Sequence, residues 1–372
     1  MITTFRRAAL VGAALAGFSC LASTPAAAAA AEGTLKIVSI DVEGGAATLY
    51  VTPEGRSFLF DTGWAAGAGP ALPPGSPPPG PTLSSAERIV AAVKAAGLTK
   101  VDYLGISHYH VDHMGGFHDL IARLQVDAFV DHGPNRQQTS PTATPAQIAT
   151  SAESMYARYE AAIAGKRRIV MKAGDTLSLG DLTFTAVTSD RQQIAAPLSG
   201  AGGPGARCGE ATVKGSDTSE DAFSLGLVAQ WGQARVLALA DTPWNVETRL
   251  VCPTNLIGKV DLMIADNHGN DAANAPLLLG NVRPTAILVN NGPTKGADGP
   301  ALERLSAIAP GAVWQLHYAT RSPDKNAAPA QIANIEGPED AMHTLTVLVS
   351  KSGDVTFVNP RTGGSKTYPR AR

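Results

Sequence analysis

The 372-residue chain contains few charged and few aromatic side chains. Asp, Glu, Lys and Arg make up 17% of the residues, and Phe, Trp and Tyr make up 5%. The formal net charge is −2 and no run of basic residues occurs, so the chain has no footprint of strong non-specific nucleic-acid binding. Hydrophobic residues reach 44%, which is enough for a globular core.

The first 31 residues have the features of an export signal. Arg6 and Arg7 precede an apolar stretch at 8–22, and small residues at 26–31 offer cleavage sites. The apolar stretch falls short of the roughly 20 residues that a membrane span needs. We expect residues 1–31 to be cleaved after Sec or twin-arginine export. Residues 32–372 would then form a single domain, periplasmic or secreted, with no membrane span.

Cysteine is also scarce, because the chain has three and the predicted signal contains one of them. The two that remain after cleavage are Cys208 and Cys252. An oxidising compartment favours a disulfide between them, and Cys208 lies in a glycine-rich loop that a cross-link would restrain. Two unpaired thiols are the alternative that the sequence leaves open.

Short apolar segments alternate with helical patterns along the chain. Helices are predicted at 84–96, which opens with the capping box Ser84-x-x-Glu87, at 145–164 and near 300–309. Glycine- and proline-rich loops occupy 67–81 and 199–205. Strands are predicted at 35–41, 47–52, 57–61, 103–107, 177–179, 182–187, 223–230, 235–240, 262–265, 286–290 and 313–315, with a C-terminal hairpin at about 343–359. The strands and helices fall into two successive halves of the chain, and this order predicts two sheets packed back to back.

The most distinctive segment follows the strand predicted at 103–107. Within six residues it places His108, His110, Asp112 and His113, and Gly115-Gly116 come directly after. Imidazole and carboxylate are usual ligands of a borderline divalent metal. Four such groups would lose solvation if they were buried without partners. The segment therefore predicts a metal site.

These residues resemble a known family. The pattern His-x-His-x-Asp-His at 108–113, followed by Gly-Gly, resembles the signature of the metallo-β-lactamase superfamily. Residues 40–47, 59–63, 238–241 and 266–270 resemble segments of its ComEC-like branch, the DNA-uptake competence type. The resemblance covers roughly residues 34–320. It implies an α/β fold of the four-layer αββα sandwich type, with two mixed sheets back to back and helices outside.

The resemblance also implies roles for individual residues. His108 and His110 would bind one metal, while Asp112, His113 and His268 would bind a second. Asp241 would bridge the two, and one or two zinc ions are expected, with manganese as the alternative. Asp61 would either orient a ligand histidine from behind or cap the turn at Thr62-Gly63.

One ligand of the family pattern is missing. Most members supply a third histidine for the first metal, but this chain has no histidine between 133 and 267. Asp190 follows a predicted strand and is a substitute, and Asp217, Glu220 and Asp221 compete with it. A carboxylate at this position would shift the metal preference from zinc toward manganese.

The resemblance implies hydrolysis by a metal-bound hydroxide, with Asp112 holding the nucleophile. The expected substrate is a small molecule, most simply a phosphodiester. The alternatives are a carbonyl hydrolase acting on a lactone, lactam or thioester, and a non-catalytic metal-binding protein. His317 and Lys295 follow predicted strands and are candidates to donate a proton or bind an anion. His118, His132 and His343 are expected to be structural.

Overall fold

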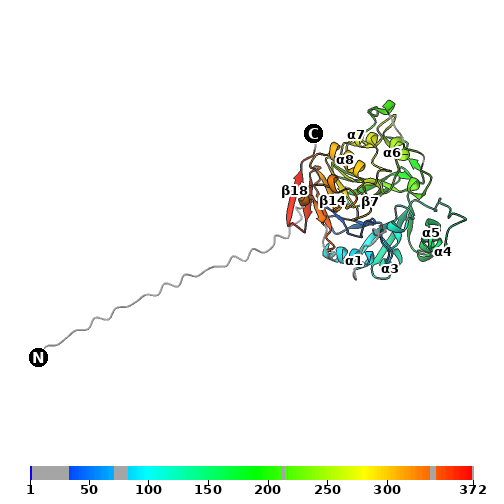
Figure 1. Ribbon diagram of the computed structural model, residues 1–372, viewed down its shortest axis with the longest axis horizontal. Helices are drawn as coiled ribbons and strands as arrows, with labels where there is room; N and C mark the ends of the chain where they lie inside the picture. Colours follow the sequence, from blue (N-terminus) through cyan, green and yellow to red (C-terminus); the bar gives the residue numbers. More distant parts are fainter. Residues whose placement is uncertain (2–32, 71–82, 211–213, 216, 336–340, 371–372) are drawn as a thin grey trace.

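The computed structural model describes Met1 and residues 33–70, 83–210, 214–215, 217–335 and 341–370 (Figure 1). Apart from Met1, the predicted signal at 1–31 lies outside the described residues, as does most of the loop predicted at 67–81. No helix in the described ranges is long and apolar enough to cross a membrane.

The first sheet is built mainly from the amino-terminal half of the chain and is completed by the carboxyl-terminal strands. Its order is β18-β17-β16-β1-β2-β3-β4-β5-β6. The strands are antiparallel from β18 to β3 and parallel from β3 to β6. Their bounds are Leu35–Ser39 for β1, Thr48–Val51 for β2, Ser57–Phe60 for β3, Lys100–Gly105 for β4, Gln125–Asp131 for β5, Arg168–Val170 for β6, Leu345–Val349 for β16, Val355–Asn359 for β17 and Gly364–Tyr368 for β18.

The second sheet uses the middle of the chain. Its order is β15-β14-β13-β12-β11-β10-β8-β7, and the short β9 pairs with β8. Strands β11 to β15 run parallel, whereas β7, β8 and β10 form antiparallel pairs. The bounds are Thr176–Leu179 for β7, Leu182–Ser189 for β8, Gln192–Gln193 for β9, Gly226–Trp231 for β10, Ala234–Ala238 for β11, Leu262–Ile264 for β12, Ala286–Val289 for β13, Val313–His317 for β14 and Ile332–Asn334 for β15.

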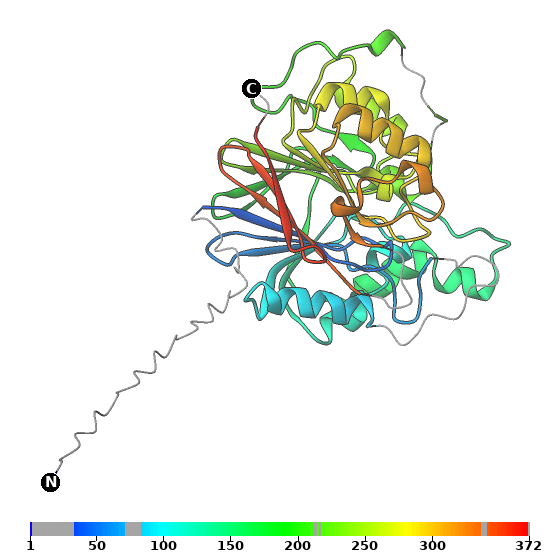
Figure 2. The same cartoon turned by 60° about the vertical axis from the view of Figure 1, so that its left-hand side comes forward.

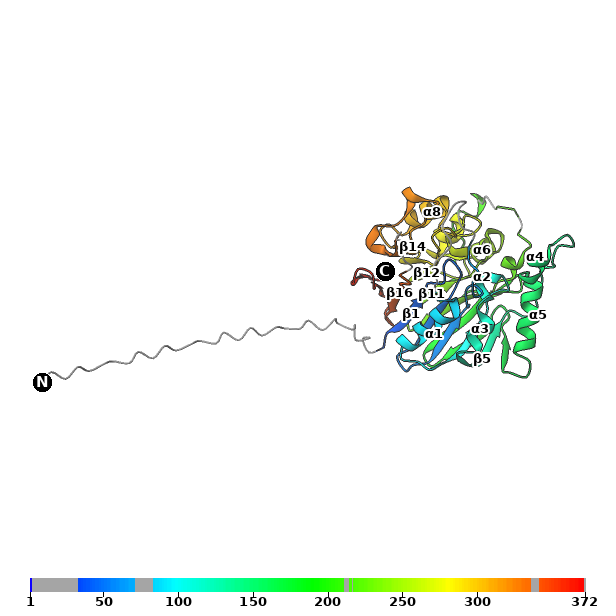
Figure 3. The ribbon, with the colours of Figure 1, turned by 60° about the horizontal axis from the view of Figure 1, so that its bottom comes forward.

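Helices cover the outer face of each sheet (Figures 2 and 3). A large apolar cluster joins the inner faces of both sheets, and a second cluster packs the first sheet against its helices. The predicted four-layer αββα sandwich is therefore confirmed. The helices of the first half are α1 (Ser85–Ala95), α2 (Val111–Met114), α3 (Phe117–Ile121), α4 (Pro145–Ala149) and α5 (Ala152–Ala162), and those of the second half are α6 (Trp244–Val251), α7 (Pro276–Val282) and α8 (Gly299–Ile308).

Two predicted elements differ from the structure, and several strands were not predicted. The helix predicted at 145–164 is two helices, because Ser151 is extended and its side chain accepts a hydrogen bond from the Ser154 N–H, which starts α5 as a new helix. The strand predicted from 223 begins at Gly226, because residues Glu220–Phe223 form a 3₁₀ turn, η2. Strands β5, β6, β9, β15 and β18 were not predicted. Most side chains of β18 are exposed, so it lacks the apolar alternation that marks a half-buried strand.

The parallel strands direct several chain segments to one edge of the sandwich. β4 leads into residues 106–113, β11 into 239–241, β12 into 265–268 and β13 into 290–295. The carboxyl ends of parallel strands are where sites assemble in α/β proteins, because the connecting loops meet there. The candidate ligands follow β4, β11 and β12.

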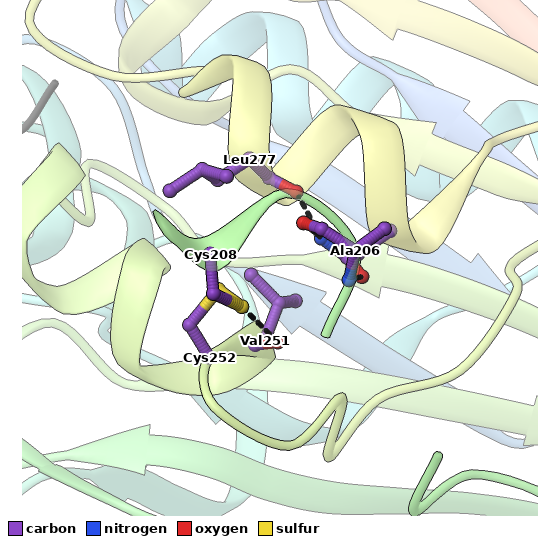
Figure 4. Close-up of a disulfide and its surroundings, with 6 residues drawn as sticks. Ala206, Cys208, Val251, Cys252 and Leu277 are labelled. Atoms are coloured by element: carbon purple, nitrogen blue, oxygen red, sulfur yellow. Dashed lines mark hydrogen bonds between the residues drawn. A yellow bond between two sulfur atoms is a disulfide. The ribbon is translucent and has the colours of Figure 1, made fainter. Parts of the chain in front are cut away.

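Cys208 and Cys252 form a disulfide that ties the glycine-rich loop to the end of α6 (Figure 4). Their Cα atoms lie 5.7 Å apart, and 44 residues separate the two cysteines in sequence. A cross-link across this separation restricts the unfolded chain more than the folded one. The pairing predicted from the two remaining cysteines is present.

Replacing Cys208 with Ala should lower the free energy of unfolding by about 2–4 kcal/mol, because the unfolded chain regains the entropy of the open loop. Urea denaturation followed by circular dichroism measures the change. Dithiothreitol should destabilise the wild-type protein by a similar amount and leave the variant unaffected. Equal midpoints for oxidised wild type and variant would show that the disulfide does not stabilise the fold.

Candidate metal centre

Glycines allow the histidine segment to pack tightly against neighbouring backbone. A Cβ at Gly115 would lie 2.4 Å from the Ala65 nitrogen, and one at Gly116 would lie 2.3 Å from the Thr62 carbonyl oxygen. The Thr62 N–H donates a 2.6 Å hydrogen bond to the His113 carbonyl. Gly115 and Gly116 thus let the turn after β3 lie directly beside α2, which carries Asp112 and His113.

One group of candidate ligands consists of Asp112, His113, Asp241 and His268, all of which are buried. The His113 Nε2 atom lies 3.1 Å from Asp241 Oδ1 and 3.1 Å from His268 Nε2. His268 Nε2 lies 3.2 Å from Asp112 Oδ2. One ligand atom from each residue falls within 4.8 Å of all the others, which is the spacing of a single metal site.

The other group consists of His108, His110 and Asp221. Because these histidines are the predicted ligands of the first metal, we name it the first group, and we name the group of Asp112, His113, Asp241 and His268 the second group. Asp221 Oδ1 lies 2.7 Å from His110 Nδ1 and 3.3 Å from His108 Nε2. This oxygen is buried and has no hydrogen-bond partner among the described residues. A buried carboxylate oxygen without a donor is costly, and a cation shared with the two imidazoles would satisfy it. The donors therefore fit a divalent metal.

Asp241 belongs to the second group, and its charge also acts on the histidines of the first group. The rings of His108 and His113 have centroids 4.1 Å apart, so the two groups are adjacent. The negative charge of Asp241 acts to raise the pKa of both His108 and His110. This position is compatible with the predicted bridging role, which stays a prediction.

The charge states of the candidate ligands differ between the two groups. Burial and the nearby His113 lower the pKa of His108 to about 4, so its imidazole is neutral. Burial also acts to lower the pKa of His113, but the Asp241 and Asp61 carboxylates outweigh it and raise this pKa to about 10. Burial would raise the pKa of Asp221, yet the two imidazoles beside it lower it to about 2. A metal would therefore displace a proton from His113 at neutral pH.

Asp61 lies behind His113 and accepts hydrogen bonds from the Ser107 N–H at 2.7 Å and the Ser107 hydroxyl at 2.8 Å. Its Oδ2 atom is 2.8 Å from His113 Nδ1, so the Nε2 atom of the same ring faces the other ligands. A carboxylate in this position fixes the orientation of a ligand histidine. The arrangement is compatible with the orienting alternative for Asp61, which stays a prediction.

Several residues at this edge adopt left-handed backbone conformations that are uncommon outside glycine. Asp61 has φ 66°, Ala240 has φ 55°, Asn267 has φ 46° and His268 has φ 53°. Each is, or directly precedes, a residue of the site. Such conformations carry strain and persist where the surrounding structure imposes them, which is common at functional sites.

The other predicted substitutes for the missing histidine lie elsewhere. The carboxylate of Asp190 accepts hydrogen bonds from Arg136 at 2.8 and 2.7 Å, and it takes no part in either group. Asp217 accepts from the Ser219 N–H and hydroxyl at 2.6 Å, and Glu220 lies 2.9 Å from His132. The η2 turn places Asp221 at the site instead. The sequence spacing did not show which of these four carboxylates replaces the missing histidine.

Lys295 is close to the candidate ligands, whereas His317 is in a different cluster. The Lys295 amine contacts the Asp112 carboxylate and lies 5.1 Å from the centre of the Trp64 ring. His317 Nε2 lies 2.7 Å from Asp41 Oδ1, and the Arg88 guanidinium contacts both Asp41 and Glu43 at 3.2 and 3.4 Å. Since Arg88 already supplies a cation there, this third cluster does not fit a metal.

Of the remaining histidines, His132 is buried against Glu220 and His118 lies on α3, while the His343 N–H donates to Asn334 at 2.9 Å. None of the three belongs to a group of candidate metal ligands within the described residues. Their surroundings agree with the structural roles that we expect.

Comparison with known proteins supports the fold. Residues 40–203 match the family model of the metallo-beta-lactamase superfamily, which identifies a domain of that superfamily in this chain. No curated protein matches the chain.

Similar solved structures include CmlA, a diiron beta-hydroxylase from Streptomyces venezuelae, at 15% identity, TM-score 0.35, and coverage of 68% of this chain and 44% of that one. A metallo-beta-lactamase motif mutant from Cronobacter sakazakii is 15% identical, with TM-score 0.29 and coverage of 55% and 60%. A diphosphatase from the PhnP family is 11% identical, with TM-score 0.36 and coverage of 76% and 94%. The chain thus spans less than two thirds of the first two structures.

Replacing Asp221 with Ala should remove about one of two bound metal equivalents, because the first group then keeps two imidazoles and no carboxylate of its own. Elemental analysis after equilibration with zinc or manganese measures the stoichiometry. The matched control is Asp190→Ala, which should keep the wild-type metal content. An unchanged content in the Asp221 variant, or a loss in the Asp190 variant, would contradict the assignment.

Proposed function

We propose that this protein is an exported, metal-dependent hydrolase of small phosphodiesters, related to the ComEC-like branch of its superfamily. The observation that carries the proposal is the adjacency of two imidazole and carboxylate groups, with the Lys295 amine in contact with Asp112. A second observation limits the substrate: the chain is slightly acidic overall, which argues against a long polynucleotide.

The donor sets indicate which residues would hold each metal. His108, His110 and Asp221 would hold one cation, and Asp112, His113 and His268 the other, with Asp241 shared. Bound divalent cations supply Lewis acidity, which activates water and polarises the oxygens of the scissile group. Two imidazoles and a carboxylate at each site form a harder donor set than three imidazoles, so manganese or iron competes with zinc.

The protein's own groups would complete the reaction. Asp112 lies at the junction of the second group and Lys295, where its carboxylate can accept a hydrogen bond from an attacking water. Lys295 retains 26% of its side-chain exposure, so its amine can meet a substrate. The amine would pair with an anionic phosphoryl oxygen or protonate the leaving group.

Lys295 is suited to proton transfer at neutral pH. Burial lowers the pKa of its amine to about 7. The contact with Asp112 acts in the opposite sense, because a neighbouring carboxylate favours the protonated amine. A metal bound to Asp112 would weaken that opposition by neutralising the carboxylate.

Export is supported by two independent features. The sequence at 1–31 has the pattern of a cleaved signal. The Cys208–Cys252 disulfide belongs to an oxidising compartment such as the periplasm or the exterior. Both agree with a periplasmic or secreted enzyme.

Metal-loaded protein should hydrolyse bis-p-nitrophenyl phosphate, and Asp112→Ala or His113→Ala should reduce kcat/KM by at least about 100-fold, since each removes a donor from the second group. Release of p-nitrophenolate measures the rate, and circular dichroism checks the fold. Turnover of nitrocefin in place of the phosphodiester would point to the carbonyl-hydrolase alternative. Full activity in either variant would overturn the proposed centre.

Replacing Lys295 with Met should lower kcat/KM for the phosphodiester by about 10- to 100-fold, because the substrate loses a charge-assisted contact. The metal content should stay at the wild-type value. The control is Lys259→Met, at an exposed residue between α6 and β12. Equal kinetics for Lys295→Met and wild type would exclude Lys295 from the reaction.

A further inference from the structure

The loop after β5 contacts both ends of the first metal group. Gln137 Oε1 lies 2.9 Å from His110 Nε2 and accepts a 2.9 Å hydrogen bond from the Glu220 N–H. Glu220 directly precedes Asp221 on the η2 turn. One amide oxygen therefore links the second histidine of the group to the turn that carries its carboxylate.

The backbone fixes which way the Gln137 amide points. The Glu220 N–H is an obligatory donor, so the atom that faces it must be the amide oxygen and not the NH₂ group. The same oxygen faces His110 Nε2, so this nitrogen must carry the proton. The lone pair of a neutral His110 then lies on Nδ1, which is the atom 2.7 Å from Asp221.

The backbone of Gln137 is itself held in place by Asn135. The Gln137 N–H donates to Asn135 Oδ1 at 3.2 Å, and the Asn135 amide donates to the Gln137 carbonyl at 2.7 Å. These reciprocal bonds close a compact turn around residues 135–137. This turn fixes the backbone from which the Gln137 side chain reaches His110 and the Glu220 N–H.

Glu220 anchors the other end of the link. Its side chain and that of His132 are fully buried, with Glu220 Oε1 2.9 Å from His132 Nε2. The second oxygen of Glu220 accepts from the Arg136 N–H at 3.1 Å. The His132 ring packs on Tyr109, the residue between His108 and His110, at a centroid distance of 4.8 Å. The turn that carries Asp221 is thus tied to the histidine segment from two sides.

We infer that Gln137 is a positioning residue that presets the first metal group, by fixing the proton of His110 on Nε2 and by holding the η2 turn so that Asp221 replaces the family's third histidine. The inference rests on the proposed metal centre. Gln137 is not one of the candidate ligands, and its effect would act through His110 and Asp221. Outer partners of this kind commonly change metal affinity by 10- to 100-fold.

The test compares Gln137→Leu with Gln137→Glu and with Gln138→Leu. Leu has a similar length but cannot accept a hydrogen bond, whereas Glu keeps an oxygen acceptor for both donors. Gln138 is the next residue and is exposed, so its replacement is the matched control. Each metal-free protein is titrated with zinc against a chromophoric chelator, and its fold is checked by circular dichroism.

We expect wild type and Gln138→Leu to bind two equivalents of zinc. Gln137→Leu should bind one equivalent with unchanged affinity and the other about 10- to 100-fold more weakly. Gln137→Glu should restore most of the lost affinity. Two equivalents at wild-type affinity in Gln137→Leu would overturn the inference and leave the metal centre standing. Absence of zinc binding in wild type would overturn the centre itself.

Nitrogen-15 NMR of the zinc-loaded protein reports which ring nitrogen of His110 carries the proton. A purely structural role of Gln137 would not change that position. In wild type, one histidine assigned to position 110 should carry a slowly exchanging proton on Nε2. In Gln137→Leu this proton should exchange rapidly, because its acceptor is gone. A proton on Nδ1 of His110 in wild type would contradict the assigned tautomer.

Discussion

The architecture depends on one electrostatic constraint, which is the burial of several imidazoles and carboxylates with their polar atoms facing one another. The Nε2 atoms of His113 and His268 are 3.1 Å apart, and both are close to the carboxylates of Asp112 and Asp241. Asp221 adds a buried oxygen that lacks a hydrogen-bond donor within the described residues. Such a collection is costly without a compensating charge, and divalent cations between the groups would supply it.

The fold makes this arrangement possible because it brings segments from both sheets to one edge. The histidine segment follows β4 of the first sheet, and Asp241 and His268 follow β11 and β12 of the second. Left-handed backbone at Ala240, Asn267 and His268 turns the chain sharply beyond those strands. The sandwich is therefore a rigid support whose strand ends, and not its core, carry the chemistry.

Much of this arrangement could be predicted from residues. The apolar periodicity predicted most strands of both sheets, and the spacing of His108, His110, Asp112 and His113 predicted a metal site. The break at Ser151 was missed because the helical pattern runs on at both sides, while the cap depends on one side-chain hydrogen bond. Asp221 could not be separated from Asp190, because the choice depends on the η2 turn and on an ion pair between Arg136 and Asp190. Nothing in the sequence pointed to Gln137, because its role depends on two contacts, with His110 and with the Glu220 N–H, that only the folded chain creates.

The proposed centre requires divalent cations in both groups of ligands. Anomalous diffraction from crystals of metal-loaded protein, recorded on both sides of the absorption edge of the metal, locates such ions directly. We predict one peak among His108, His110 and Asp221, and a second among Asp112, His113 and His268, with Asp241 beside both. Peaks elsewhere, or none at this edge of the sandwich, would contradict the account.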